Sequence, residues 1–173
     1  MPGDDDKEDD EDNDDDPTRL YWGVVYIRRL AFIDPSNPLY NVPYIGQSVR
    51  PLASAEAVAK ARWQQENAQA VRENKQIGLI AMLDVHGPEA FADEIVESKH
   101  GGRSTVKEWA NKREIELIAE SGGPLRDPTK MSNQTLNLTH GGSGSVCFAS
   151  WDALRTVWWV KFKSDMTMYV KQH

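Results

Sequence analysis

Cysteine is almost absent from this sequence, which has Cys147 alone among its 173 residues. An intrachain disulfide and a cysteine-based zinc site are therefore both excluded. The four histidines are scattered and show none of the close spacings of a histidine metal motif such as HExxH. No apolar run approaches the roughly 20 residues that cross a bilayer, and no signal peptide opens the chain. These absences predict an intracellular protein that stays out of membranes, nuclear or organellar if its source is eukaryotic.

The first sixteen residues lack every aromatic and β-branched residue. They hold eleven of the chain's 27 acidic residues and one of its 20 basic residues. Because such a run repels itself and cannot bury apolar area, we expect residues 1–17 to be a disordered acidic tail. The rest of the chain keeps 19 basic and 16 acidic residues, a net charge of +3, which permits DNA as a partner. The tail itself either aids solubility or binds a basic protein partner.

Residue type and spacing predict six elements. Three segments read as strands: 22–29, 44–49 and 90–96. Three segments read as helices: 54–74, 77–85 and 104–120. Ser54 is the expected N-cap of the first helix, and Ser104 or Thr105 that of the third. Three prolines predict a loop at 31–43, between the first two strands.

This order of elements predicts an α/β domain, a small three-stranded antiparallel sheet flanked by helices, over residues 20–145. Residues 146–173 have helical spacing of tryptophan, leucine, phenylalanine and methionine. We interpret them as a C-terminal helical extension. It is either a terminal helix packed on the domain or the start of a further region. The oligomeric state is not indicated by any pattern.

Strand alternation places two tyrosines on one side of the predicted sheet. In the first strand, Val25 and Ile27 share a face and Tyr26 lies on the other. In the second strand, Tyr44 lies on the face opposite Ile45. If both aliphatic faces point inward, the two phenols project together. They are either ordinary strand tyrosines, which are common in sheets, or part of a site.

Arg62 lies on the apolar stripe of the first predicted helix, seven residues after Ala55. An arginine on the sheet-facing side of a helix needs an anionic partner there. That partner is either Glu66, four residues further on, or a phosphate, which the planar guanidinium fits well.

Glu114 lies within the buried stripe of the third predicted helix, with apolar residues one turn before and after it. A carboxylate on such a stripe is costly unless a cation meets it. The candidates are a hard metal ion, which prefers oxygen ligands, and the guanidinium groups of Arg62 or Arg113. Glu116 falls off the stripe and is expected to be solvated.

The order of these features along the chain resembles that of the GIY-YIG nuclease superfamily. Five segments carry the resemblance: VVY at 24–26, YIG at 44–46, KARW at 60–63, EIELI at 114–118 and LNLTHGG at 136–142. The run YIGQS closely matches the second motif, and the last segment resembles that of the homing-endonuclease branch. The first motif departs from the family, since it reads VVY rather than GIY. Glu66 stands where a histidine is often found.

The resemblance implies hydrolysis of DNA phosphodiester bonds with one divalent metal ion, Mg²⁺ or Mn²⁺, held by Glu114. It implies that Tyr26 activates the attacking water, a role that requires nearby positive charge to lower the pKa of the phenol. Arg62 would stabilise the phosphate in the transition state. Tyr44 would hydrogen-bond the phosphate or the nucleophile, and Asn137 would brace the site.

DNA contacts are expected along the second motif, from Gly46, Gln47 and Ser48 and from Arg50 just after it. A solvated surface arginine is the alternative for Arg50. Two other functions remain open on the sequence. One is a catalytically inactive DNA-binding module of the same fold, and the other is an interaction protein that acts through the acidic tail.

Overall fold

The computed structural model describes residues 17–37, 40–72, 78–124, 134–137 and 141. In chain order the elements are β1 (Leu20–Arg29), β2 (Pro43–Arg50), α1 (Ala55–Arg72), α2 (Gly78–His86), the 3-10 turn η1 (Pro88–Ala90), β3 (Ala92–Gly102) and α3 (Arg103–Glu120). None of the described helices is long and apolar enough to span a bilayer.

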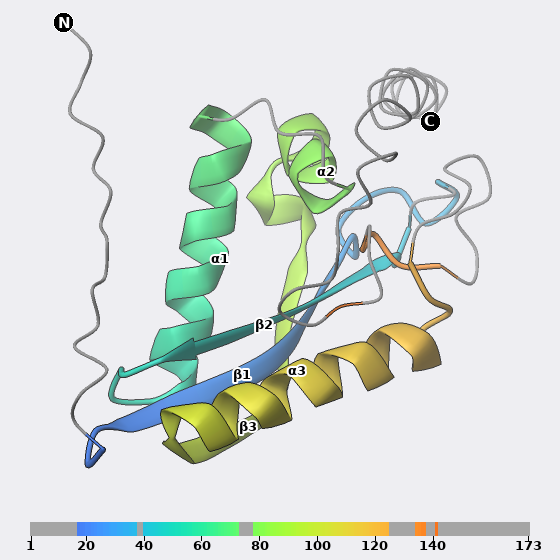
Figure 1. The fold of residues 1–173 in the computed structure, drawn as a ribbon. Coiled ribbons are helices and arrows are strands. Elements are labelled where there is room, and N and C mark those ends of the chain that lie inside the picture. Colours follow the sequence, from blue (N-terminus) through green and yellow to red (C-terminus); the bar gives the residue numbers. More distant parts are fainter. Residues whose placement is uncertain (1–16, 38–39, 73–77, 125–133, 138–140, 142–173) are drawn as a thin grey trace, which may run out of the picture.

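The three strands form one antiparallel sheet in the order β2-β1-β3, so β1 is central and β2 lies at an edge. α1 covers one face of this sheet and α3 covers the other, as Figure 1 shows. The predicted fold class, a small three-stranded antiparallel sheet flanked by helices, is confirmed.

Two apolar clusters pack on the two faces of β1, because successive side chains of a strand point to opposite faces. The buried members on the α1 side are Val24, Tyr26, Ala55, Val58 and Ala59. The buried members on the α3 side are Val25, Ile27, Ile45, Leu117 and Ile118. The predicted alternation of β1 is therefore correct, and both of its faces are covered.

β3 differs most from the prediction. The sequence predicts a strand at 90–96, whereas β3 begins at Ala92 and continues to Gly102. The second half of the strand is polar and lacks the β-branched residues by which strands are recognised. It is held in the sheet by pairing with the start of β1, where the rings of Trp22 and His100 stack with centroids 4.4 Å apart.

The helix starts give one confirmed cap and one correction. Ser54 precedes α1, and its hydroxyl accepts a hydrogen bond of 3.1 Å from a backbone N–H of the first turn. The cap predicted at Ser104 or Thr105 is wrong, because α3 already begins at Arg103 and its N-cap, Gly102, makes no side-chain hydrogen bond. β3 runs directly into α3, which leaves no loop in which such a cap would lie.

The other predicted boundaries lie within two residues of the observed ones. Several expectations fall outside the described residues. These are most of the acidic tail, the C-terminal extension at 146–173 and parts of the last motif, at 138–140 and 142.

Candidate active site at the edge of β2

The candidate site lies at β2, where α1 and α3 approach the edge strand from its two faces. Tyr26 of β1 and Tyr44 of β2 both project on the α1 side, with ring centroids 6.5 Å apart. The structure thus brings the two predicted phenols together. Tyr26 is fully buried, whereas Tyr44 is half-buried. Tyr44 is therefore the phenol that a ligand at the surface would reach first.

Gly46 makes room for Tyr26. The two residues are direct partners in the β1–β2 pairing, and a Cβ atom at Gly46 would overlap the ring and hydroxyl of Tyr26. Trp63 of α1 meets the Tyr26 ring edge-on, with centroids 5.9 Å apart. Gly46 is itself buried, so its clearest contribution is to the position of this phenol.

Gly46→Ala is expected to lower the free energy of unfolding by about 1–3 kcal/mol, the usual cost of forcing a methyl group into a packed interior. The methyl group would also displace the hydroxyl of Tyr26. Chemical denaturation measures the loss. Gly102→Ala is the matched control, because a Cβ there meets nothing within 4 Å, and should cost at most about 1 kcal/mol. Equal losses from both variants would contradict the role given to Gly46.

Glu66 of α1 is the centre of a buried polar network. Its side chain is 2% exposed and accepts a hydrogen bond of 3.0 Å from the hydroxyl of Tyr26. The buried guanidinium of Arg28 donates to the other carboxylate oxygen at 3.5 Å. Arg28 is held in turn by Asp93 of β3 (2.8 Å) and by Asn67 (3.0 Å). A buried carboxylate needs both positive charge and hydrogen bonds, and Glu66 has both.

Burial shifts the proton affinities of this network. Burial first, and the charge of Glu66 second, raise the pKa of Tyr26 well above its ordinary value; Arg62 opposes them but is outweighed. Burial also raises the pKa of Glu66, against the positive charges of Arg62 and Arg28. The sequence-based expectation that positive charge lowers the pKa of Tyr26 is thus corrected. The phenol keeps its proton and donates it in a hydrogen bond to a carboxylate.

Arg62 lies between this network and the surface. Its side chain is 32% exposed, and its Nε is 3.8 Å from Glu66, so the ion pair considered from the sequence is present. That Nε is buried and has no hydrogen-bond partner within the described part of the chain. Nη1 donates to Oε1 of Gln65 at 3.0 Å. The side chain therefore has a buried Nε beside Glu66 and a guanidinium end that is partly open to solvent.

Gln65 joins Arg62 to a second arginine. Its Oε1 also accepts a hydrogen bond of 2.8 Å from Nη2 of Arg50, whose Nε donates to Ser48 at 3.3 Å. Two guanidinium groups thus share one uncharged acceptor. Glu66 offsets part of the charge of Arg62, whereas Gln65 and Ser48 are uncharged and leave that of Arg50, so this part of the surface is suited to bind a phosphate.

Glu114 approaches β2 from the opposite face, on α3. The carboxylate is half-buried. Burial is the main cause of the raised pKa of Tyr44, and the negative charge of Glu114 raises that pKa further. Arg113, one partner considered for Glu114, instead pairs with Glu97 at 2.7 Å and with Glu116. Glu116 is partly exposed as predicted, although it is paired.

Gly141 lies against the carboxylate of Glu114. Its φ of +93° belongs to the region that favours glycine, and a Cβ there would lie 2.9 Å from both Oε1 of Glu114 and Cδ1 of Ile118. A side chain does not fit there, so the backbone of residue 141 packs directly against the carboxylate.

Asn137 holds the outer edge of β2. Its Oδ1 accepts a hydrogen bond of 2.9 Å from the N–H of Ile45, and its Nδ2 donates to the carbonyl of the same residue at 2.6 Å. The neighbouring Leu136 donates to the carbonyl of Pro43 at 2.8 Å. Asn137 thus takes the place of a strand partner for the residue that follows Tyr44.

The remaining residues of the second motif lie on both faces of β2. Ser48 lies on the α1 side, close to Arg50, whereas Gln47 hydrogen-bonds to Asn111 of α3 on the other. Sequence patterns do not mark Gln65 and Asn111 as polar residues of the site. Strand alternation places Arg28 on the face of Tyr26 but does not reveal its partners.

Among the described residues, no group of three or more histidine, cysteine, aspartate or glutamate side chains is arranged to hold a metal ion. A metal ion at Glu114 would therefore take most of its ligands from water and phosphate, as magnesium commonly does. No family model, curated protein or solved structure matches the chain.

Proposed function

We propose that this protein is a metal-dependent endonuclease that hydrolyses phosphodiester bonds of DNA, as its resemblance to the GIY-YIG nucleases implies. The observation that supports this most is the arrangement at β2: the partly exposed Arg62 of α1 lies beside Tyr26 and Glu66 on one face of the strand, and the half-buried carboxylate of Glu114 on α3 flanks the other face. A phosphate needs positive charge and a hydrated divalent cation needs a carboxylate, and this edge offers both.

The two arginines joined by Gln65 supply the phosphate-binding part of the proposal. Arg62 binds the scissile phosphate through the exposed part of its guanidinium, and Arg50 binds the same or the adjoining phosphate. Negative charge grows on the phosphate oxygens in the transition state, so the stabilisation by a fixed guanidinium grows with it. Tyr44 keeps its proton because its pKa is raised, and donates a hydrogen bond to the phosphate.

Glu114 fits the metal that the resemblance implies. It is a partly exposed carboxylate, and Mg²⁺ (or Mn²⁺) binds through one or two carboxylates while keeping several waters. When bound, the ion would stabilise negative charge on the leaving oxygen. Glu114 would be its ligand from this chain.

The proton of the attacking water passes to Tyr26 and then to Glu66, 3.0 Å away. One O–H bond of the water breaks as the water oxygen bonds to phosphorus and the bond to the leaving oxygen breaks. The Tyr26 oxygen gains that proton and gives its own to Glu66, which ends neutral. The raised pKa of Glu66 makes it a better acceptor than an ordinary carboxylate. Tyr26 is fully buried, so this step requires that DNA binding admit a water molecule to its hydroxyl.

Glu66→Gln is expected to lower the single-turnover cleavage rate roughly a hundredfold while DNA affinity changes little. Glutamine still accepts the hydrogen bond from Tyr26 but does not take its proton. In the wild type, Glu66 must be ionised to act, so the rate should rise as pH rises through its folded pKa, which lies above the ordinary value. The variant should lack this acidic limb, and rates measured against pH test both effects.

Glu56→Gln is the matched control, since it removes the same charge from the exposed first turn of α1 and should leave the profile unchanged. Adding Tyr26→Phe to Glu66→Gln should cause little further loss, because both residues act in one relay. A Glu66→Gln protein with the wild-type rate and the wild-type acidic limb would remove Glu66 from the mechanism.

The complete burial of Tyr26 favours one other function, a DNA-binding module of this fold that does not cleave. In that case Arg50 and Arg62 bind the DNA backbone without hydrolysis. Binding and Mg²⁺-dependent cleavage, measured on the same duplex, separate the two functions: binding with no cleavage supports the second.

A further inference from the structure

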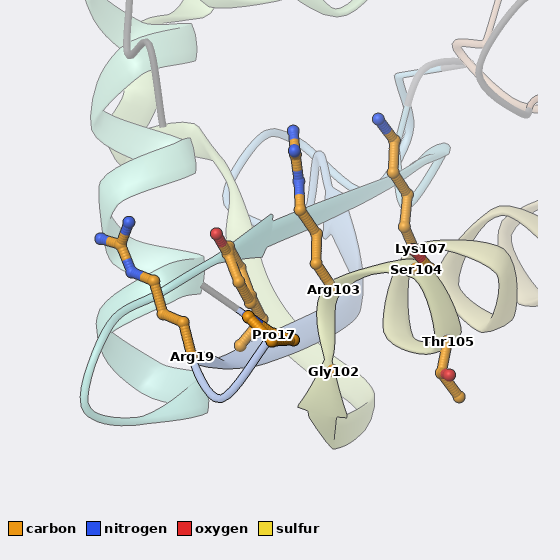
Figure 2. A pocket seen from close by; sticks show the side chains of 8 residues that line it. Pro17, Arg19, Gly102, Arg103, Ser104, Thr105 and Lys107 are labelled. Atoms are coloured by element: carbon orange, nitrogen blue, oxygen red, sulfur yellow. The ribbon is translucent and has the colours of Figure 1, made fainter. Parts of the chain in front are cut away.

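A basic depression of about 670 Å³ lies where β3 runs into α3, apart from the site at Tyr44. The side chains that line it include three cations and three hydroxyl groups: Arg19, Tyr21, Arg103, Ser104, Thr105 and Lys107. No carboxylate is among its lining residues in the described part of the chain. Figure 2 shows Arg19, Arg103 and Lys107 extending to the same side of the molecule.

Helical spacing aligns this depression with the proposed metal ligand. Lys107 and Arg103 precede Glu114 on α3 by seven and eleven residues, close to two and three turns of about 3.6 residues each. All three side chains therefore lie on one flank of α3. Asn111 lies between Lys107 and Glu114 along the helix and hydrogen-bonds to Gln47 of β2. This flank of α3 therefore faces the edge strand.

We propose that this flank of α3 is a track for the DNA backbone on one side of the cut, ending in the basic depression. The proposal rests on the nuclease function and adds the path of the substrate. At about 1.5 Å per residue, Lys107 lies about 10 Å and Arg103 about 16 Å along the helix from Glu114. Each DNA strand carries a phosphate about every 3.4 Å of axis, so a track parallel to the DNA axis spans roughly three to five phosphates.

The charge distribution favours a polyanion as the ligand of this depression. Residues 17–173 carry a net charge of only +3, yet three of their cations line this one depression. Lysine and arginine next to hydroxyl groups is the combination that contacts phosphate oxygens irrespective of base sequence. The depression is thus expected to add affinity and salt dependence rather than sequence preference.

The test compares DNA binding by the full chain and by the Arg103→Ala/Lys107→Ala protein, with EDTA present so that no cleavage occurs. The probe is a 30-base-pair duplex, titrated at several salt concentrations. Two lost phosphate contacts should lower the slope of log affinity against log salt by about two and weaken binding roughly tenfold or more at low salt. Cleavage by the wild type with Mg²⁺ is measured in parallel.

Lys99→Ala/Lys112→Ala is the matched control, because it removes two exposed lysines that do not line the depression. Equal losses from both double variants would show a general charge effect and overturn the track. No loss from Arg103→Ala/Lys107→Ala in a protein that cleaves DNA would overturn the track and leave the nuclease function standing. A wild type that neither binds nor cleaves DNA would overturn both.

The acidic residues 1–16 adjoin Pro17 at the rim of the depression and are the other occupant to test. The same comparison is therefore repeated on a chain without residues 2–16. The loss of affinity in Arg103→Ala/Lys107→Ala should persist there. Its disappearance would mean that the two cations serve the acidic segment, and would overturn the DNA track.

Discussion

Replacing Glu114 with alanine should abolish Mg²⁺-dependent cleavage of plasmid DNA while the protein stays folded. In the proposed mechanism Glu114 is the ligand from this chain that holds the ion, so its loss removes the stabilisation of the leaving oxygen. The fold should survive because the side chain is half-buried and lies on a helix flank, where substitutions usually cost little. Conversion of supercoiled plasmid measures cleavage, and thermal unfolding followed by circular dichroism reports the fold.

Glu116→Ala is the matched control for this prediction. It removes a carboxylate two residues further along α3, where Glu116 pairs with Arg113 and not with the proposed site. Cleavage should therefore change little. Full activity of Glu114→Ala would refute the metal assignment, whereas loss of activity in Glu116→Ala would mean that the wrong flank of α3 has been assigned to the site.

Arg62→Ala should reduce the single-turnover cleavage rate at least a hundredfold, since one donor that stabilises a transition-state charge is often worth roughly this much. Arg62 is a partly exposed guanidinium next to Tyr26 and Glu66. Arg62→Lys should recover only part of the rate, because an ammonium group does not present the planar fork.

The ion pair between Arg62 and Glu66 offers a different explanation for a loss of activity, through stability rather than catalysis. The free energy of unfolding of Arg62→Ala therefore needs to be measured beside its rate. A mild effect on cleavage together with a clear loss of stability would assign Arg62 to the structural pair. Arg113→Ala is a control, since its partners lie on β3 and the far flank of α3.

Much of the fold followed from periodicity, because both helices and strands leave regular apolar patterns. The alternation of Val25 and Ile27 against Tyr26 was correct, and so was the N-cap at Ser54. The second half of β3 was missed because its polar residues are held by pairing with β1, which local sequence does not record. Tertiary contacts of this kind override intrinsic strand preference.

The site was predictable in its outline and not in its electrostatics. Alternation and helix phase bring Tyr26, Tyr44 and Arg62 to one face, as observed. They do not show how deeply each group is buried. The pKa of Tyr26 is raised rather than lowered because burial and Glu66 outweigh Arg62, a balance that only the packed structure sets. Gln65 was not predicted for a similar reason, because its role depends on the position of the Arg50 guanidinium, which only the folded structure sets.

The most direct test of the account is an incubation of the wild-type protein with duplex, flap, branched and single-stranded DNA, each with Mg²⁺, with Mn²⁺ and with EDTA. The placement of Arg62 and Tyr44 on one face of β2 and of Glu114 on the other predicts cleavage of at least one of these substrates with a metal ion present and none with EDTA. A folded protein that leaves all four intact with both metal ions would contradict it.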